Sequence, residues 1–100
     1  MMDKKLEPIP PGEILLEEFL RPLGVTQNQL SRDIDVPVSR IASIVKGERA
    51  ITADTALRLG KYFGTSAEMW LSLQADFDLR RLRAEGWAEL EKRIRPLHAA

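Results

Sequence analysis

The sequence contains no cysteine, a single histidine (His98) and no long apolar run. Without cysteine there can be no disulfide bond, no thiolate metal site and no cysteine nucleophile. No hydrophobic stretch approaches the roughly 18 residues that span a membrane, and the N-terminus has none long enough for a signal peptide. The sequence therefore predicts a cytoplasmic protein that binds no membrane, no metal and no cofactor.

Catalytic patterns are also missing from this chain of 100 residues. A small enzyme would need a nucleophile beside a base, a cluster of metal ligands or a phosphate-binding loop, and none of these is present. The alternation of β-branched residues that indicates strands is absent as well. Because 44% of the residues are hydrophobic, the chain can build one core. We expect an all-α domain that is not an enzyme.

The formal net charge is zero, which counts against binding to nucleic acid, because phosphate contacts supply most of the nonspecific affinity. The charges are distributed unevenly, however. Residues 1–20 hold two lysines and five acidic residues, whereas residues 21–65 hold seven basic and four acidic residues. A basic surplus of about +3 therefore lies in the middle of the chain.

Proline, glycine and capping residues mark the helix boundaries, because they separate apolar runs at helical spacing. The first helix is expected to open at Pro11 and to be stopped by Pro22 and Gly24. A capping box of the T-x-x-Q kind that begins at Thr26 opens the second helix, which should end near residues 33–35. The other three helices are expected over about residues 37–46, 53–63 and 67–84.

These boundaries predict a single compact domain of about five helices over residues 11–84. An extended lead-in of residues 1–10 precedes it. Residues 85–100 follow the break at Gly86 and form a short amphipathic extension. A stripe of apolar residues at helical spacing is expected to pack in the core of the domain. Its members are Trp70, Leu73 and Phe77.

Two short helices, near residues 26–33 and 37–46, are joined by a turn of three or four residues. This is the helix-turn-helix arrangement. Its inner side chains must be apolar in order to lock the two helices at a steep angle, and they are Leu30, Ile34, Ile41 and Ile44. The turn usually needs a residue with positive φ. Asp35 occupies that place, and aspartate tolerates this conformation better than most residues.

The outer face of the second helix has side chains that can touch base edges in double-stranded DNA. The candidate base-reading residues are Val38, Ser39, Arg40 and Ser43. Val38 can meet a thymine methyl group, Arg40 can pair with guanine, and a serine can serve either partner. The candidate phosphate contacts lie at helix ends and are Gln27, Lys46 and Arg49. The alternative is an ordinary helical corner whose charged face is only solvated.

Motifs in several parts of the chain make the interpretation more specific. They are Pro11-Gly12-Glu13-Ile14-Leu15, Glu18-Phe19-Leu20, Pro22-Leu23-Gly24, Ile51-Thr52-Ala53-Asp54-Thr55-Ala56-Leu57-Arg58-Leu59, Trp70-Leu71-Ser72-Leu73-Gln74 and Asp78-Leu79. Residues 26–49 resemble the Xre family of phage-repressor-like helix-turn-helix proteins. With the motifs above, residues 8–80 resemble HigA-type antitoxins, in order and without evident gaps.

The resemblance implies a five-helix domain that binds a palindromic operator as a homodimer and represses its own operon. It also implies a partner toxin similar to the RelE-type ribonucleases. Gln27 matches the phosphate-contacting glutamine of the family. Val38, Ser39 and Ser43 match its base-reading positions, and Arg40 lies beside them. The sequence departs from the family at Asp35, where glycine is common, and at Pro37, where a capping serine or threonine is common.

The partner surfaces are predicted from charge and apolar character. Glu13 and Glu17, in the acidic first helix, are candidates for attracting a basic toxin, although they can equally serve only to keep that helix soluble. The candidate dimer residues follow residue 65 and are Trp70, Phe77, Trp87 and Leu90. A stand-alone transcriptional regulator without a toxin partner is the alternative function.

Overall fold

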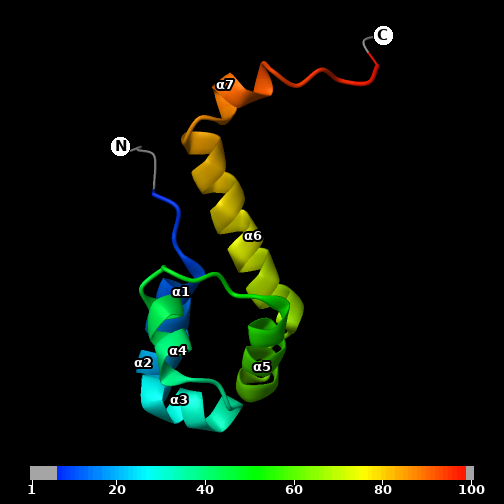
Figure 1. Cartoon of the computed structure of the whole chain (residues 1–100). Coiled ribbons are helices and arrows are strands. Elements are labelled where there is room, and N and C mark those ends of the chain that lie inside the picture. The colour runs from blue at the N-terminus through cyan, green and yellow to red at the C-terminus, as the bar shows by residue number, and fades with distance from the viewer. Residues whose placement is uncertain (1–6, 99–100) are drawn as a thin grey trace.

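The computed structural model describes residues 7–98, and every regular element in that range is helical. The elements in chain order are α1 (Pro11–Ile14), the π-helical η1 (Leu15–Leu20), α2 (Arg21–Leu23), α3 (Gln27–Ile34), α4 (Val38–Val45), α5 (Ala53–Phe63), α6 (Ala67–Ala84) and α7 (Trp87–Glu91). Figure 1 shows the first helices gathered into a bundle, from which α6 rises with α7 at its far end. The predicted all-α fold is confirmed.

One continuous helix, formed by α1, η1 and α2, opens the bundle, and Gly24 ends it with a φ of 68°. The prediction that Pro22 stops this helix is wrong, since Pro22 lies inside α2. Proline lacks the N–H that an α-helix would bond to the carbonyl of Glu18. The preceding η1 turn is wound more loosely, with the N–H of Arg21 bonded to the carbonyl of Leu16, and the helix continues past the proline.

The core is a cluster of aliphatic side chains around Trp70, whose side chain is fully buried. The indole N–H of Trp70 donates to Thr65 Oγ1 at 2.9 Å, and the rings of Phe19 and Trp70 lie 4.9 Å apart. The other buried apolar residues are Leu15, Leu20, Leu30, Ile34, Val36, Ile41, Ile44, Ile51, Ala56 and Leu59. The core role predicted for Trp70 is confirmed. Its assignment to a dimer surface is wrong, because a fully buried side chain cannot reach a second copy.

The helix-turn-helix corner forms from α3 and α4, as the sequence predicts. Thr26 Oγ1 accepts the backbone N–H of Gln29 at 3.0 Å and so caps the start of α3. Asp35 follows α3 with a φ of 58°, and within residues 7–98 no other residue except glycine has a positive φ. Pro37 offers no side-chain cap, and α4 begins at Val38. The four predicted inner residues, Leu30, Ile34, Ile41 and Ile44, are all buried.

Two contacts fix the position of α4 within the bundle. First, α1 approaches the end of α4 so closely that a Cβ atom on Gly12 would lie 1.7 Å from the carbonyl oxygen of Ile44. Second, the side-chain carbonyl of the buried Gln74 in α6 accepts the backbone N–H of Ile51 at 2.8 Å, which anchors the loop after α4. The amide group of Gln74 donates to Asp78 at 3.1 Å. The end of α4 is therefore held from both sides.

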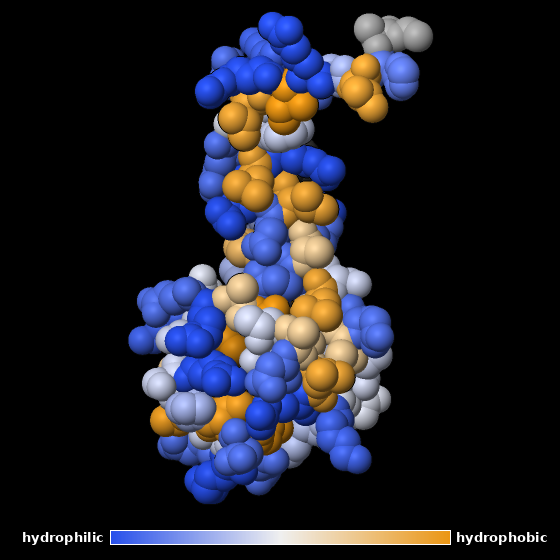
Figure 2. All heavy atoms as spheres, turned by 45° about the vertical axis from the view of Figure 1, so that its right-hand side comes forward, coloured by the Kyte–Doolittle hydropathy of each residue, from blue (hydrophilic) through white to orange (hydrophobic). Residues whose placement is uncertain are grey.

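The far half of α6 projects from the bundle and has few neighbours, as the extended outline of Figure 2 makes plain. Phe77 is half-buried, and Arg81 stacks over its ring, with the guanidinium carbon 5.7 Å from the ring centre. Beyond it, the apolar residues Leu79, Leu82, Trp87, Leu90 and Ile94 are exposed. None of the helices within residues 7–98 has the length and apolar character needed to cross a membrane. The domain boundaries at residues 10 and 84 stay predictions.

Replacement of Gly12 by alanine should destabilise the bundle, because the added methyl group overlaps the carbonyl of Ile44 and cannot fit unless α1 and α4 move apart. We expect the free energy of unfolding to fall by about 1–3 kcal/mol, the usual cost of overpacking. Urea unfolding followed by circular dichroism measures the change. Alanine at the neighbouring exposed Glu13 is the control, and equal stability of the two variants would contradict the close approach.

Candidate nucleic-acid interface

The α4 helix turns its apolar side toward the core and leaves the opposite side open. Val38 is 42% exposed, Ser39 is exposed and Ser43 is half-buried. At about 100° per residue, Ser39 and Ser43 lie on the side of α4 opposite the buried Ile41 and Ile44, and Val38 lies at one edge of that side. The major groove of DNA admits an α-helix, and there a serine hydroxyl can pair with donors or acceptors on base edges. The outer face of α4 therefore has the shape and chemistry of a base-reading surface.

Arg40 lies at the other edge of this outer face, about 100° round the helix from Ser39 in the opposite sense to Val38. Its Nη1 donates to Asp54 Oδ2 in α5 at 3.3 Å. The sequence predicts Arg40 on the same face as the serines, whereas in the structure its side chain turns toward α5. A guanidinium has five N–H donors, so the contact with Asp54 leaves others available.

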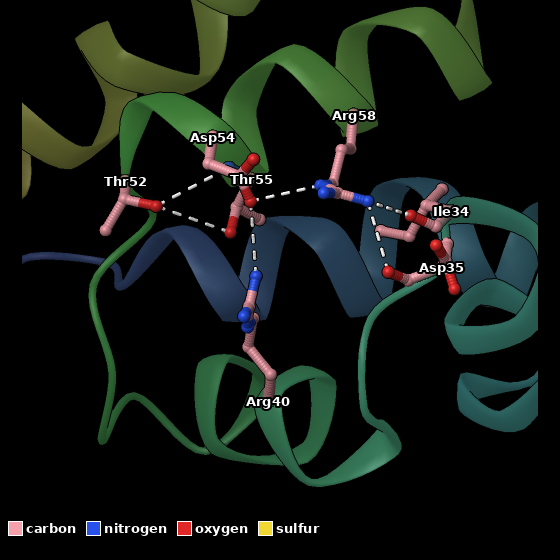
Figure 3. A network of polar contacts seen from close by, with 7 residues as sticks. All are labelled: Ile34, Asp35, Arg40, Thr52, Asp54, Thr55 and Arg58. Atoms are coloured by element: carbon pink, nitrogen blue, oxygen red, sulfur yellow. Dashed lines mark hydrogen bonds and ion pairs between the residues drawn. The ribbon is translucent and has the colours of Figure 1, made fainter.

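Asp54 is the centre of a polar network at the first turn of α5, drawn in Figure 3. Its Oδ2 accepts Nε of Arg58 at 3.0 Å. Nη1 of Arg58 in turn donates to the carbonyl oxygens of Ile34 at 2.7 Å and Asp35 at 3.1 Å. We call Arg40, Asp54 and Arg58 the Asp54 clamp. The clamp ties together the end of α3, the start of α4 and the start of α5.

The electrostatics of the clamp favour the ionised form of Asp54. The hydrogen bond from Arg58, together with the positive charges of Arg58 and Arg40, holds the pKa of the carboxyl group below its ordinary value, although partial desolvation opposes this. Because the pKa of Asp54 is lowered in the folded state, the stabilisation is present above its unfolded pKa. It is lost as the pH falls through the folded value. The clamp is therefore intact at neutral pH.

A second side-chain contact joins α5 to the end of α3, in addition to that of Arg58. The hydroxyl of Tyr62 donates to Asp33 Oδ2 at 2.7 Å, and this hydrogen bond raises the pKa of Tyr62. Local sequence patterns predict no role for Asp54, Arg58 or Tyr62. Their partners on α3 and α4 lie 14 to 29 positions away in the chain, where local patterns carry no information. The one available signal was the spacing of Asp54 and Arg58, which allows an ion pair along a helix.

The predicted phosphate contacts lie at the ends of the two helices of the corner. Gln27 is the first residue of α3 and is half-buried. Lys46 follows the last turn of α4, and Arg49 lies in the next loop. Both basic side chains are exposed, and neither forms an ion pair with another residue of the described range. They are therefore available to an anion that approaches this end of α4.

The residues predicted to contact protein partners lie on other elements. Glu13 and Glu17 are exposed on the first helix, where Glu17 Oε2 lies 3.4 Å from Nε of Arg21. Trp87 and Leu90 are exposed on α7. The outer face of α4 and these candidate partner surfaces therefore occupy separate helices.

Comparison with known proteins shows which family this chain belongs to. The sequence model of a helix-turn-helix family matches residues 16–70. Virulence-associated protein I of Dichelobacter nodosus is 51% identical over 72 residues, which cover 72% of this chain and 67% of that relative. Antitoxin HigA-1 of Vibrio cholerae is 32% identical over 97 residues, which cover 97% of this chain and 90% of the antitoxin.

A solved structure gives the same result for the fold. The Pseudomonas aeruginosa antitoxin HigA, determined with the higBA promoter, matches this chain with a TM-score of 0.84 at 41% sequence identity. The match covers 91% of this chain and 99% of that one. The resemblance found in the sequence is therefore confirmed, and the chain belongs to the helix-turn-helix family of HigA antitoxins and related regulators.

Proposed function

We propose that this chain is an antitoxin that binds operator DNA through α4, represses its own operon and neutralises a protein toxin. The observation that carries the proposal is the open outer face of α4, on a chain 41% identical to a HigA antitoxin whose structure was solved with its promoter. In this proposal the chain acts in the cytoplasm by binding alone and catalyses no reaction.

DNA recognition would divide between the outer face of α4, the start of α3 and the segment that follows α4. Val38, Ser39 and Ser43 enter the major groove and contact base edges, while Arg40 pairs with a guanine from the edge of the helix. The phosphate contacts come from Gln27, Lys46 and Arg49. Phosphate contacts set the position of the protein on the duplex, and base contacts set its sequence preference. The zero net charge is no obstacle, because two exposed basic side chains, Lys46 and Arg49, lie at the end of the reading helix.

Replacement of Lys46 by glutamine tests the phosphate contact. The binding constant for a duplex selected from random DNA by the unaltered protein should fall, and so should that for unrelated DNA. The slope of its logarithm against the logarithm of salt concentration should decrease by about one unit, because one fewer counterion is released. Lys61→Gln on α5 is the matched control, because Lys61 is also exposed and also forms no ion pair within residues 7–98. An unchanged slope for Lys46→Gln would remove that residue from the interface.

We propose a homodimer as the DNA-binding form, since one short reading helix covers too few base pairs for selectivity in a genome. Two copies related by a two-fold axis would place their α4 helices about 34 Å apart on a palindromic operator. The apolar residues of the projecting segment favour this segment as the dimer surface (Figure 2). Leu82, Trp87 and Leu90 line a hollow of about 640 Å³ between α6 and α7, which a second copy would fill. Phe77, half-buried on α6, lies at the base of this segment.

Light scattering tests the dimer. The unaltered protein should have twice the chain mass of 11.3 kDa. Leu82→Asp should reduce that mass to a single chain and weaken operator binding, because it puts a charge into an apolar interface. Leu57→Asp changes a leucine on α5 that is somewhat more exposed (65% against 54% for Leu82) and should leave the mass unchanged. A monomeric mass for the unaltered protein, both free and on DNA, would refute the dimer.

The toxin is proposed to be a RelE-like ribonuclease that docks on the acidic first helix. A protein that grips RNA must be basic, so a negative surface attracts it and raises the rate of association. Glu13 and Glu17 supply exposed charge there, and an exposed ion pair such as Glu17 with Arg21 is weak enough to exchange partners. Because the reading face of α4 is on another helix, the toxin complex can still bind the operator.

Co-purification from the native host, followed by charge reversal, tests the toxin. A protein of toxin size should copurify with the unaltered chain. The double change Glu13→Lys with Glu17→Lys should weaken the complex over a range of salt while helicity by circular dichroism is retained. Glu68→Lys with Asp76→Lys makes the same charge change on α6 and serves as the control. If no partner copurifies, the stand-alone regulator is favoured, and equal affinity of the folded double variant would exclude the first helix as the docking surface.

A further inference from the structure

The Asp54 clamp joins a residue of the reading helix to the turn that sets the angle of this helix. Asp54 Oδ2 accepts both Nη1 of Arg40 at 3.3 Å and Nε of Arg58 at 3.0 Å. The other end of Arg58 holds the carbonyl oxygens of Ile34 and Asp35, at the left-handed turn between α3 and α4. Figure 3 shows these contacts as a continuous path from Arg40 to Asp54, which then turns toward Arg58 and the carbonyl oxygens of Ile34 and Asp35. A substitution of Asp54 would therefore remove contacts to the reading helix and to Arg58, which binds the turn before that helix.

Asp54 is placed for this role by the local structure of α5. Thr52 Oγ1 accepts the backbone N–H of Thr55 at 3.4 Å and begins the helix, which fixes Asp54 in its first turn. A carboxylate in the first turn of a helix is favoured by the helix dipole. The dipole alone, however, does not require a partner on α4. The contact with Arg40 is the feature that a purely local role leaves unexplained.

We propose that Asp54 and Arg58 are positioning residues for sequence reading. Asp54 holds the guanidinium of Arg40 at the edge of α4, and Arg58 holds Asp54 in place, so that Arg40 contacts a single base pair. This inference rests on the proposed DNA binding by α4. A free arginine side chain has many rotamers and reaches several base and phosphate acceptors. An arginine held through one Nη1 hydrogen loses that freedom before it meets DNA, and its other donors remain for a guanine, which accepts two hydrogen bonds.

The charges of the clamp distinguish positioning from simple attraction to DNA. Asp54 is 57% exposed and carries a negative charge toward the reading side, so by Coulomb's law alone it weakens binding to any duplex. Its removal should therefore raise or leave unchanged the affinity for unrelated DNA. If Asp54 positions Arg40, the same removal lowers the preference for the operator. A residue needed only for stability would instead lower both affinities together.

A double-mutant cycle on sequence preference is the test. The probes are the duplex that the unaltered protein selects from random DNA and its variants, each changed at one base pair. Arg40→Ala identifies the base pair whose preference depends on Arg40. Asp54→Asn should reduce discrimination at that base pair by about fivefold, the lower end of what an arginine–guanine pair contributes. In the Arg40→Ala background, Asp54→Asn should have no further effect on discrimination.

Matched variants keep the outcomes distinct. Asp76→Asn breaks a pair with Arg80 that has the same spacing and the same 3.0 Å Nε–Oδ2 distance as Asp54 with Arg58, and it should leave discrimination unchanged. If Asp54→Asn unfolds, Asp54→Glu replaces it in the cycle and should lose less discrimination than Arg40→Ala. Discrimination that is unchanged, or that falls equally in both backgrounds, would overturn the positioning role. If the unaltered protein selects no DNA sequence, the proposed function itself fails.

Discussion

The angle between α3 and α4 depends on one backbone conformation, the left-handed turn at Asp35. For an L-residue other than glycine this conformation costs roughly 1 kcal/mol, and it persists because the surroundings hold it. The burial of Leu30 and Ile34 on one side, and of Ile41 and Ile44 on the other, draws the two helices together. The guanidinium of Arg58 then binds the carbonyl oxygens on both sides of the turn. The direction in which the outer face of α4 points is therefore set by this corner.

The remaining helices hold the corner rigid and leave its outer face open. α1 meets the end of α4 at Gly12, and α6 anchors the next loop through Gln74. The bundle therefore covers the apolar inner side of α4. The outer side of α4 stays open to a partner. The projecting half of α6 and α7 is the reverse case, since it exposes apolar side chains that the bundle does not cover. The two regions suit different partners, one polar and charged, the other apolar.

Local rules predict the parts of this structure that depend on neighbours in sequence. Gly24 and Gly86 adopt positive φ at the breaks that the sequence marks, and the tolerance of aspartate for that conformation predicts the turn at Asp35. The inner face of the corner was predicted as well, because helical periodicity identifies it. The prediction is wrong at Pro22, since a looser π-helical turn can accommodate a proline inside a helix.

Contacts between distant parts of the chain could not be predicted in this way. The pairing of Arg40 with Asp54, and of Arg58 with the turn, spans 14 to 24 positions. Trp70 could be read as core or as surface, because its helical stripe continues from the buried half of α6 into the exposed half. Only the packed structure decides where along such a stripe the bundle ends.

The most direct test of DNA reading through α4 is an amide NMR titration of the ¹⁵N-labelled protein with a duplex that it selects from random DNA. Peaks of Val38, Ser39 and Ser43 should shift most. Those of Gln27 and of the loop around Arg49 should follow, and all these shifts should be smaller with unrelated DNA. Shifts concentrated on α6 and α7, or identical shifts with every duplex, would contradict sequence reading by this face.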